Sequence, residues 1–244
     1  MIPNEERKWQ VEAYPKLLQA LRGALDEHEK EMNKKLLITA AVPGRKEDID
    51  IAFTKDTIPK IFDSLDFMNV MTYDLLNRRD TKTKHQSGLK GSRDSLELYI
   101  ERGAPADRLN LGFPFHVKWF QTEGDCDPEK PIGCDMPLLE DPKTGADLFN
   151  SAGLGRRDEF GAAKASYDLA LKKAKFDGEG TAYWDEAGKK FWTFDDEESI
   201  MAKFPLVEDM DLGGVFAWGL GQDSEGFPLV NVVRAEVAKM NEDR

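Results

Sequence analysis

The spacing of apolar residues along the chain changes repeatedly between the pattern of a helix and that of a strand. Apolar side chains at intervals of three and four predict an amphipathic helix over residues 5–34. The next segment, 36–42, is apolar on both faces and stops at Pro43-Gly44, as expected of a covered parallel strand. The alternation continues with predicted helices at 56–64 and 92–102 and predicted strands at 66–73 and 109–115.

The second half of the chain interrupts this alternation. Residues 120–160 are rich in Pro, Gly and acidic residues and predict a long loop, followed by a helix at 162–174. Two aromatic-rich runs around a turn in TAYWDEAGKKFWTFDD (181–196) predict a β-hairpin. A helix at 196–204, a last strand at 213–220 and a helix at 228–240 close the chain.

These elements predict an α/β fold in which four parallel-type strands alternate with helices and an α+β insertion precedes the last strand. A closed (β/α)8 TIM barrel needs twice as many strands, so the chain is expected to form half of one. The predicted organisation is a barrel portion at 1–118, an insertion with the aromatic hairpin at 119–195, and the last helix-strand-helix of the barrel at 196–244.

Composition narrows the range of partners. The chain has 244 residues, of which 40% are hydrophobic, and a formal net charge of −12. This is the composition of a globular domain, and the lack of a basic surplus disfavours nucleic acid as a partner. No apolar run is long enough for a membrane helix, and the start, MIPNEERKW, lacks the apolar core of a signal peptide. We therefore expect no membrane partner, and the sequence leaves the compartment unknown.

The only two cysteines, Cys126 and Cys134, lie in the Pro- and Gly-containing segment GDCDPEKPIGCD. A disulfide between them would staple this loop and would favour an oxidising compartment. Two unpaired thiols are the alternative.

The most informative segment is FMNVMTYD, residues 67–74, because an apolar strand ends there on a tyrosine and an aspartate. Ligands of parallel α/β sheets and barrels bind at the carboxyl ends of the strands. Tyr73 and Asp74 are therefore candidate substrate-binding residues. The three histidines share no metal-ligand spacing, so neither a metal nor a cofactor is expected.

Four motifs occur in the order and with the intervening elements of a known family: AAVPG at 40–44, NVMTYD at 69–74, NLGFPF at 110–115 and GGVFAWGL at 213–220. In these the chain resembles the C-terminal half of glycoside hydrolase family 18, the chitinases and their relatives. The continuation YDLLNRRDTKTKHQSG is similar to a fungal branch of the family.

The resemblance implies a TIM barrel that hydrolyses β-1,4 links between N-acetylglucosamine units of chitin or chitooligosaccharides. It implies retention of configuration with the substrate's acetamide as nucleophile, and an extracellular location for the complete family member. It assigns supporting catalytic roles to Tyr73 and Asp74 and sugar-binding roles to Met71 and Trp218. A core methionine and a strand-end tyrosine that bonds the backbone are the structural alternatives.

The family's acidic glutamate ends a strand motif, Asp-x-x-Asp-x-Asp-x-Glu, that precedes the first helix of the resembled half. The full motif does not occur in this sequence. Asp48 and Asp50 imitate part of it, but we interpret them as solvated loop residues. Without the acid, activity of this chain alone is not expected.

Two further departures concern the walls of the site. The usual Tyr and Arg of the motif Gly-x-Pro-Phe-Tyr-Gly-Arg are replaced by His116 and Lys118, which are candidate substitute donors. Trp119, Trp184 and Trp192 are better explained by packing of the insertion than by sugar contact.

Three hypotheses follow: a chitinase-type hydrolase, a catalytically inactive chitin-binding or interaction protein, and a truncated gene product. Half a barrel would leave open edges and would turn residues such as Ile38, Val70 and Phe216 toward the missing half, so self-association is also predicted.

Overall fold

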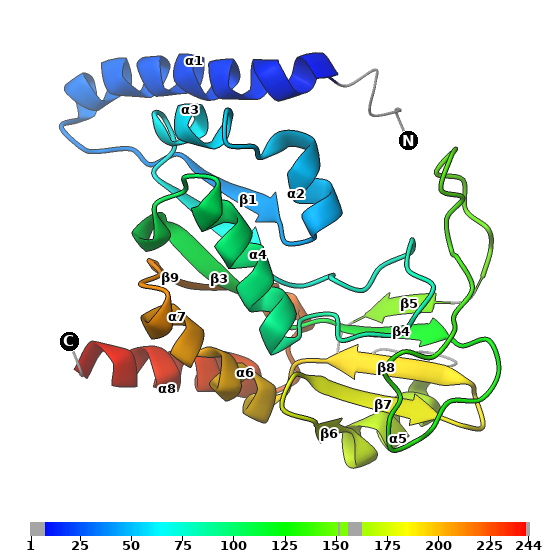
Figure 1. The fold of residues 1–244 in the computed structure, drawn as a ribbon. Coiled ribbons are helices and arrows are strands. Elements are labelled where there is room, and N and C mark those ends of the chain that lie inside the picture. Colours follow the sequence, from blue (N-terminus) through cyan, green and yellow to red (C-terminus); the bar gives the residue numbers. More distant parts are fainter. Residues whose placement is uncertain (1–7, 151, 156–162, 243–244) are drawn as a thin grey trace. The chain divides into compact units, whose positions relative to one another are not determined.

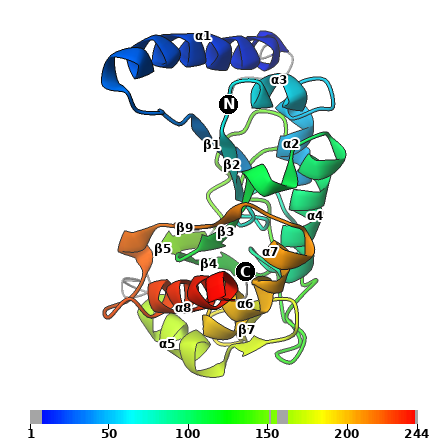
Figure 2. The same ribbon diagram turned by 90° about the vertical axis from the view of Figure 1, so that its left-hand side faces the viewer.

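The computed structural model describes residues 8–150, 152–155 and 163–242 and contains two compact units (Figures 1 and 2). The first comprises the chain up to Thr72, Arg93–Gly112 and Val207–Phe216. The second comprises Tyr73–Ser92, Phe113–Leu206 and the residues from Ala217 onward. Each unit is described by itself below.

The sheet of the first unit has the strand order β1-β2-β3-β9. Its strands are β1 (Thr39–Pro43), β2 (Phe67–Met71), β3 (Leu109–Pro114) and β9 (Gly214–Trp218), the last residues of β3 and β9 belonging to the second unit. The pairs β1–β2 and β2–β3 are parallel, with Val70 opposite both Val42 and Leu111. The predicted alternation of strands and helices is therefore confirmed here, although β1 begins three residues later than expected.

One face of this sheet is much more buried than the other. Val42, Val70 and Leu111 are at most 1% exposed, whereas Phe67, Asn69 and Met71 on the alternate positions of β2 are only partly buried. Because side chains alternate across a strand, Val70 lies on the opposite face from Asn69. The expectation that Ile38 and Val70 would face the missing half of a barrel is wrong, because both are buried.

The partly buried face includes a polar pair and a close ring contact. Asn110 Nδ2 donates to Asn69 Oδ1 at 2.9 Å across the parallel register. A Cβ at Gly112 would lie 2.8 Å from the ring of Phe216, so only glycine fits beneath this ring.

Helices of the first unit are α1 (Lys8–Met32), α2 (Lys46–Ala52), α3 (Ile58–Phe62), most of α4 (Leu89–Glu101) and η2 (Ala106–Arg108). Figure 1 shows α1 alongside α3. Arg22 joins α1 to the loops around the sheet, donating to Leu36 O at 2.9 Å and pairing with Asp66.

Helix α2 lies where the sequence predicted a loop, so the interpretation of Asp48 and Asp50 as loop residues is wrong. Asp50 is exposed on this helix and pairs with Lys46 at 2.6 Å and with Arg102. The spacing of Lys46 and Asp50, four residues apart, is itself typical of a helix.

The second unit is built on a five-stranded sheet with the order β5-β4-β8-β7-β6 (Figure 1). The strands are β4 (Val117–Gln121), β5 (Ala152–Gly155), β6 (Lys175–Phe176), β7 (Thr181–Asp185) and β8 (Lys190–Phe194). The predicted hairpin is confirmed as β7–β8. Strands β4 and β5 were not predicted, and β5 lies within the segment expected to be a long loop.

Both faces of this sheet are covered. Helix α5 (Lys164–Lys173) packs on β7 and β8, where Tyr167, Trp192 and Phe194 form one cluster. Phe120, Trp184 and Phe191 form a second cluster that includes Cys126. The remaining helices are α6 (Glu197–Lys203), α7 (Pro205–Asp209, largely of the first unit), η4 (Leu220–Gln222) and α8 (Pro228–Glu242), with α6 beside α8.

Candidate functional site

Asp74 follows the end of β2 and has a left-handed backbone, with φ 57°. Among residues other than glycine, asparagine and aspartate adopt this conformation most readily. The turn is held at its start by Thr72, whose Oγ1 donates to Gly112 O at 2.8 Å and accepts from Gly112 N at 3.0 Å. The side chain of Asp74 is 46% exposed at this position.

One oxygen of Asp74 has two partners in the second unit. His116 Nε2 lies 2.9 Å from Asp74 Oδ1, and Lys118 Nζ lies 2.7 Å from the same oxygen. Lys118 Nζ also donates to Leu76 O at 3.2 Å. Asp74 Oδ2 has no partner within the described ranges, so one oxygen is anchored and the other is open.

Burial alone would raise the pKa of Asp74, but the hydrogen bond from His116 and the charge of Lys118 outweigh it. The result is a pKa lowered to about 2. Asp74 is therefore an ionised hydrogen-bond acceptor at any ordinary pH and does not serve as a proton donor.

The imidazole of His116 is 3% exposed, and its Nδ1 is buried without a hydrogen-bond partner in the described residues. Because the ionised carboxylate can only accept, Nε2 carries a proton and donates to Asp74. Gln86 Nε2 fixes the same segment by donating to His116 O at 3.2 Å.

Tyr73 lies next to this group and is 5% exposed. Its ring meets that of His116 edge to face, with centroids 5.7 Å apart. Burial and, secondarily, the charge of Asp74 raise the pKa of Tyr73, so its hydroxyl stays protonated and can donate.

Trp218 ends β9 with 63% of its surface exposed. Its carbonyl oxygen accepts from Phe115 N at 2.8 Å, one residue before His116. The backbone thus links the exposed indole to the segment that holds Asp74. The structure brings together Tyr73, Asp74 and the end of β9, together with His116 and Lys118.

Met71 belongs to the first unit, at the last position of β2 opposite Pro43. It lies on the partly buried face of that sheet with Asn69.

The other tryptophans that the sequence singled out lie within or against the second unit's cores. Trp184 and Trp192 are at most 2% exposed, and their indole nitrogens donate to Thr122 and Ser166. Trp119 packs against Trp192, with ring centroids 6.2 Å apart.

Sequence reasoning missed a second imitation of the acidic motif, Asp125-Cys126-Asp127-Pro128-Glu129. Cys126 of this run forms a disulfide bond with Cys134, and the Cα atoms of the two residues are 5.7 Å apart. Asp125 pairs with Lys189, and Glu129 pairs with Lys175 at 3.2 Å, both carboxylates being exposed. These acids are therefore on a surface loop rather than at the end of a buried strand.

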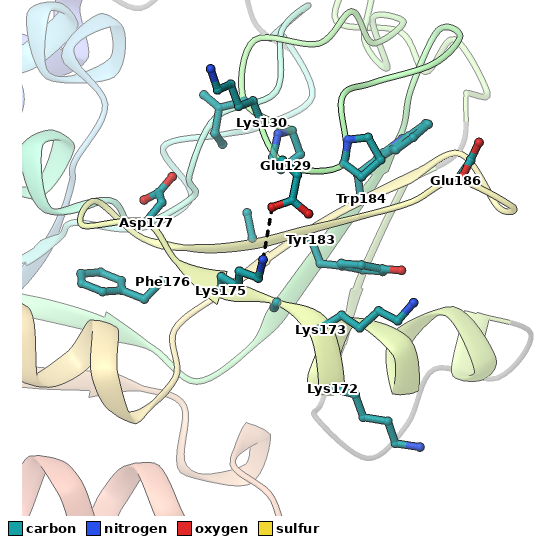
Figure 3. A pocket seen from close by; sticks show the side chains of 15 residues that line it. Glu129, Lys130, Lys172, Lys173, Lys175, Phe176, Asp177, Tyr183, Trp184 and Glu186 are labelled. Carbon is teal, nitrogen blue, oxygen red and sulfur yellow. Dashed lines mark hydrogen bonds and ion pairs between the residues drawn. The ribbon is translucent and has the colours of Figure 1, made fainter.

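A separate pocket lies at the edge of the second unit's sheet and is lined by none of the residues discussed as sugar ligands (Figure 3). The described residues contain no cluster of three or more side chains suited to a metal ion. They also include no helix with the length and hydropathy to cross a bilayer.

The sequence of the chain matches that of a known protein family. The sequence profile of "Glycosyl hydrolases family 18" matches residues 3–223. Mouse chitotriosidase-1 is 28% identical over 252 residues, which cover 93% of this chain and 50% of that protein.

Two solved structures have similar folds. A Trichuris suis chitinase matches with a TM-score of 0.72 at 22% identity, over 94% of this chain and 66% of its own. Human YKL-39 is described as a pseudo-chitinase that retains chitooligosaccharide binding. It matches with a TM-score of 0.72 at 20% identity, over 95% of this chain and 66% of its own. The chain spans about half the length of curated relatives such as mouse chitotriosidase-1.

Proposed function

This chain is a chitinase-like member of glycosyl hydrolase family 18, and from that premise we propose that it forms the C-terminal half of the family barrel and binds chitooligosaccharides without hydrolysing them by itself. The observation that carries this proposal is the state of Asp74: one carboxylate oxygen is held by His116 and Lys118, and the other is open.

An ionised carboxylate with one free oxygen is suited to accept a hydrogen bond from a sugar hydroxyl or amide group. Charge-assisted hydrogen bonds of this kind are about twice as strong as neutral ones. Because Oδ1 is fixed by two donors, Oδ2 is presented in one orientation, which reduces the entropy lost on binding. Tyr73, which precedes Asp74 in the chain, provides a hydroxyl that stays protonated.

Trp218 supports a sugar ligand through its exposure. A tryptophan that only filled a core would be buried, as Trp184 and Trp192 are, whereas Trp218 is 63% exposed. The face of an indole ring is a platform for the C–H face of a pyranose, and Trp218 lies close along the backbone to the segment that anchors Asp74. We assign Met71 a sugar-binding role from its place in the family motif alone.

The absence of a suitable acid argues against hydrolysis by this chain. A general acid must be protonated and within reach of the leaving oxygen, and it contributes about 10² to 10⁴ in rate. Asp74 is ionised, and the exposed carboxylates of Asp50 and Glu129 are paired with Lys46 and Lys175. The Asp-x-x-Asp-x-Asp-x-Glu motif is absent from the sequence.

The second candidate function is hydrolysis of chitin by a larger assembly in which another segment supplies the acid strand. The match to about half the length of mouse chitotriosidase-1 favours it. In that case Tyr73 and Asp74 would support catalysis in the assembly, and this chain by itself would retain binding alone.

Two measurements test the proposal. Calorimetry with chitotetraose should show binding that Asp74→Asn weakens, and release of the chromophore from an aryl chitobioside should stay at background. Turnover at an ordinary enzyme rate would contradict the assignment of an inactive chain, and Glu129→Gln, Asp48→Asn and Asp50→Asn would then test whether one of these carboxylates is the acid. No binding in the calorimeter would remove sugar recognition altogether.

A further inference from the structure

Strand β7 has an open edge. It pairs with β8 along its whole length, but on its other side β6 pairs only with Thr181 and Ala182. The ladder stops because α5 continues to Lys173, and Ala174 still donates its N–H to Ala170 O at 2.8 Å. No strand of the described chain therefore lies beside Tyr183–Asp185 on this side.

A pocket of about 880 Å³ surrounds this edge (Figure 3). Residues 128–132, inside the disulfide loop, line one side of it, and the end of α5 at 172–174 lines another. Tyr183 and the neighbouring backbone of β7 lie between them. The volume falls within the range of about 300–1,000 Å³ that is typical of ligand pockets.

The loop wall is held in place without any ligand. The bond between Cys126 and Cys134 closes it, and Thr83, which is 1% exposed, binds it repeatedly. Thr83 Oγ1 donates to Pro131 O at 2.6 Å and accepts from Cys134 N at 2.9 Å, while Thr83 O accepts from Gly133 N at 2.9 Å. A wall that is fixed in advance lowers the cost of binding.

The pocket is lined by four lysines and three carboxylates, in a chain of net charge −12. Two of its carboxylates are engaged, Glu129 with Lys175 at 3.2 Å and Asp177 with His85 at 2.9 Å. Its other carboxylate, Glu186, lies beyond the end of β7, toward the turn into β8.

Three exposed lysines of the pocket, Lys130, Lys172 and Lys173, have no ion pair in the part of the chain that the structure describes. Figure 3 shows Lys130 on the loop side and Lys172 and Lys173 on the α5 side. The uncompensated positive charge therefore stands on both sides of the open edge.

We propose that this pocket binds an extended acidic peptide segment of a partner protein, which adds to the sheet beside Tyr183–Asp185 in the position that β6 leaves unfilled. Main-chain hydrogen bonds to the edge of β7 provide affinity, as in other cases of strand addition. Side chains of an added strand point alternately to its two faces, so acidic residues reach Lys130 on one wall and Lys172 or Lys173 on the other. The proposal does not depend on sugar binding at Asp74.

Lysines on an exposed edge can also act only to prevent aggregation, and this role predicts no ligand. A sulfated oligosaccharide would use the same lysines without pairing to the backbone. The probe is therefore the fluorescein-labelled peptide Glu-Glu-Val-Glu-Glu-Val, followed by fluorescence anisotropy. A peptide with Gln in place of each Glu removes the charge, and an acidic peptide with alternate N-methylated amides removes the main-chain donors.

We expect the acidic peptide to bind in a salt-sensitive manner and both altered peptides to bind more weakly. Replacing Lys130, Lys172 and Lys173 by Gln should weaken binding about tenfold, the sum of three exposed ion pairs. The matched control Lys143→Gln, an exposed lysine outside the pocket, should change nothing. Thermal unfolding of each variant confirms that it is folded.

Absence of binding by the acidic peptide overturns the proposal in favour of the protective role. Equal binding of the N-methylated and the unmodified acidic peptides shows a purely ionic site and also overturns the proposal. The same holds if a sulfated hexasaccharide displaces the acidic peptide and N-methylation has no effect.

Discussion

His116 Nε2 lies 2.9 Å from Asp74 Oδ1, while Nδ1 of the same ring is buried with no partner among the described residues. Because the ionised carboxylate of Asp74 can only accept, Nε2 donates to it, and Lys118 Nζ lies 2.7 Å from the same oxygen. Two side chains that differ from the tyrosine and arginine of the resembled motif thus hold the aspartate in its ionised form.

The first prediction concerns the ionisation of Asp74. Lys118→Met should raise the pKa of Asp74 from about 2 toward or above the ordinary value, because desolvation remains while the opposing charge is lost. Lys118→Arg should keep it low. Side-chain carboxyl ¹³C shifts followed by NMR between acidic and neutral pH measure this directly. An unchanged titration in Lys118→Met would show that the lysine has no electrostatic role.

The same group predicts how stability depends on pH. The folded pKa of Asp74 is below that of the unfolded chain, so its contribution is present above about pH 4 and is lost as the pH falls toward 2. In Lys118→Met this part of the acid dependence should shrink, as measured by urea unfolding at several pH values. An identical pH dependence in the two proteins would contradict the linkage.

The third prediction concerns the exposed indole. Trp218→Ala should weaken chitotetraose binding by about 1 to 3 kcal/mol, by analogy with other aromatic stacking platforms. Trp9→Ala is a matched control, since Trp9 is 66% exposed on α1 and Trp218 is 63% exposed. Calorimetry should show the loss for Trp218 alone. An equal affinity in both variants would leave Trp218 without a role in binding.

The strands and helices that alternate regularly could be predicted from sequence because each carries one clear periodicity. Thus 213–220 and 228–240 closely match β9 and α8. Strand β4 was missed because Val117 and Phe120 are buried on opposite faces, which removes the alternation that marks a half-exposed strand. Helix α2 was missed because its seven residues were interpreted through a resemblance to an acidic motif.

The candidate site was only partly predictable for a related reason. Tyr73 and Asp74 follow a strand and could be found by their place in the sequence. That His116 and Lys118 would bind the same carboxylate oxygen depends on the path from β3 into β4, and spacing alone does not determine it.

The fourth prediction concerns a buried ion pair beside α6. Lys203 Nζ lies 2.7 Å from both oxygens of Asp195, both side chains are 1% exposed, and Ser87 Oγ donates to Asp195 at 2.7 Å. Lys203→Met leaves the carboxylate buried without its cation and should cost about 3–5 kcal/mol of unfolding free energy.

The exposed pair of Lys46 and Asp50 is the control, and Lys46→Met should cost less than about 1 kcal/mol. Adding Asp195→Asn to Lys203→Met should restore part of the loss, because the uncompensated charge is removed. Denaturant unfolding measures all three. Equal costs for Lys203→Met and Lys46→Met would rule out a structural role for the buried pair.

The last prediction is self-association through the sheet of the first unit. Strands β1 and β9 are the outer strands of that sheet, and Phe67, Asn69 and Met71 lie on its partly buried face. An unpaired edge beside a partly apolar face favours pairing with another chain. We expect concentration-dependent association in size-exclusion chromatography with light scattering.

Ala41→Lys should reduce this association, because Ala41 is exposed on β1 and opposite Asn69. Gln19→Lys, which adds the same charge on an exposed position of α1, should not. A monodisperse monomer with one sharp thermal transition at all concentrations would show that the chain protects this sheet by itself, and it would strengthen the case for an independently folded binding protein.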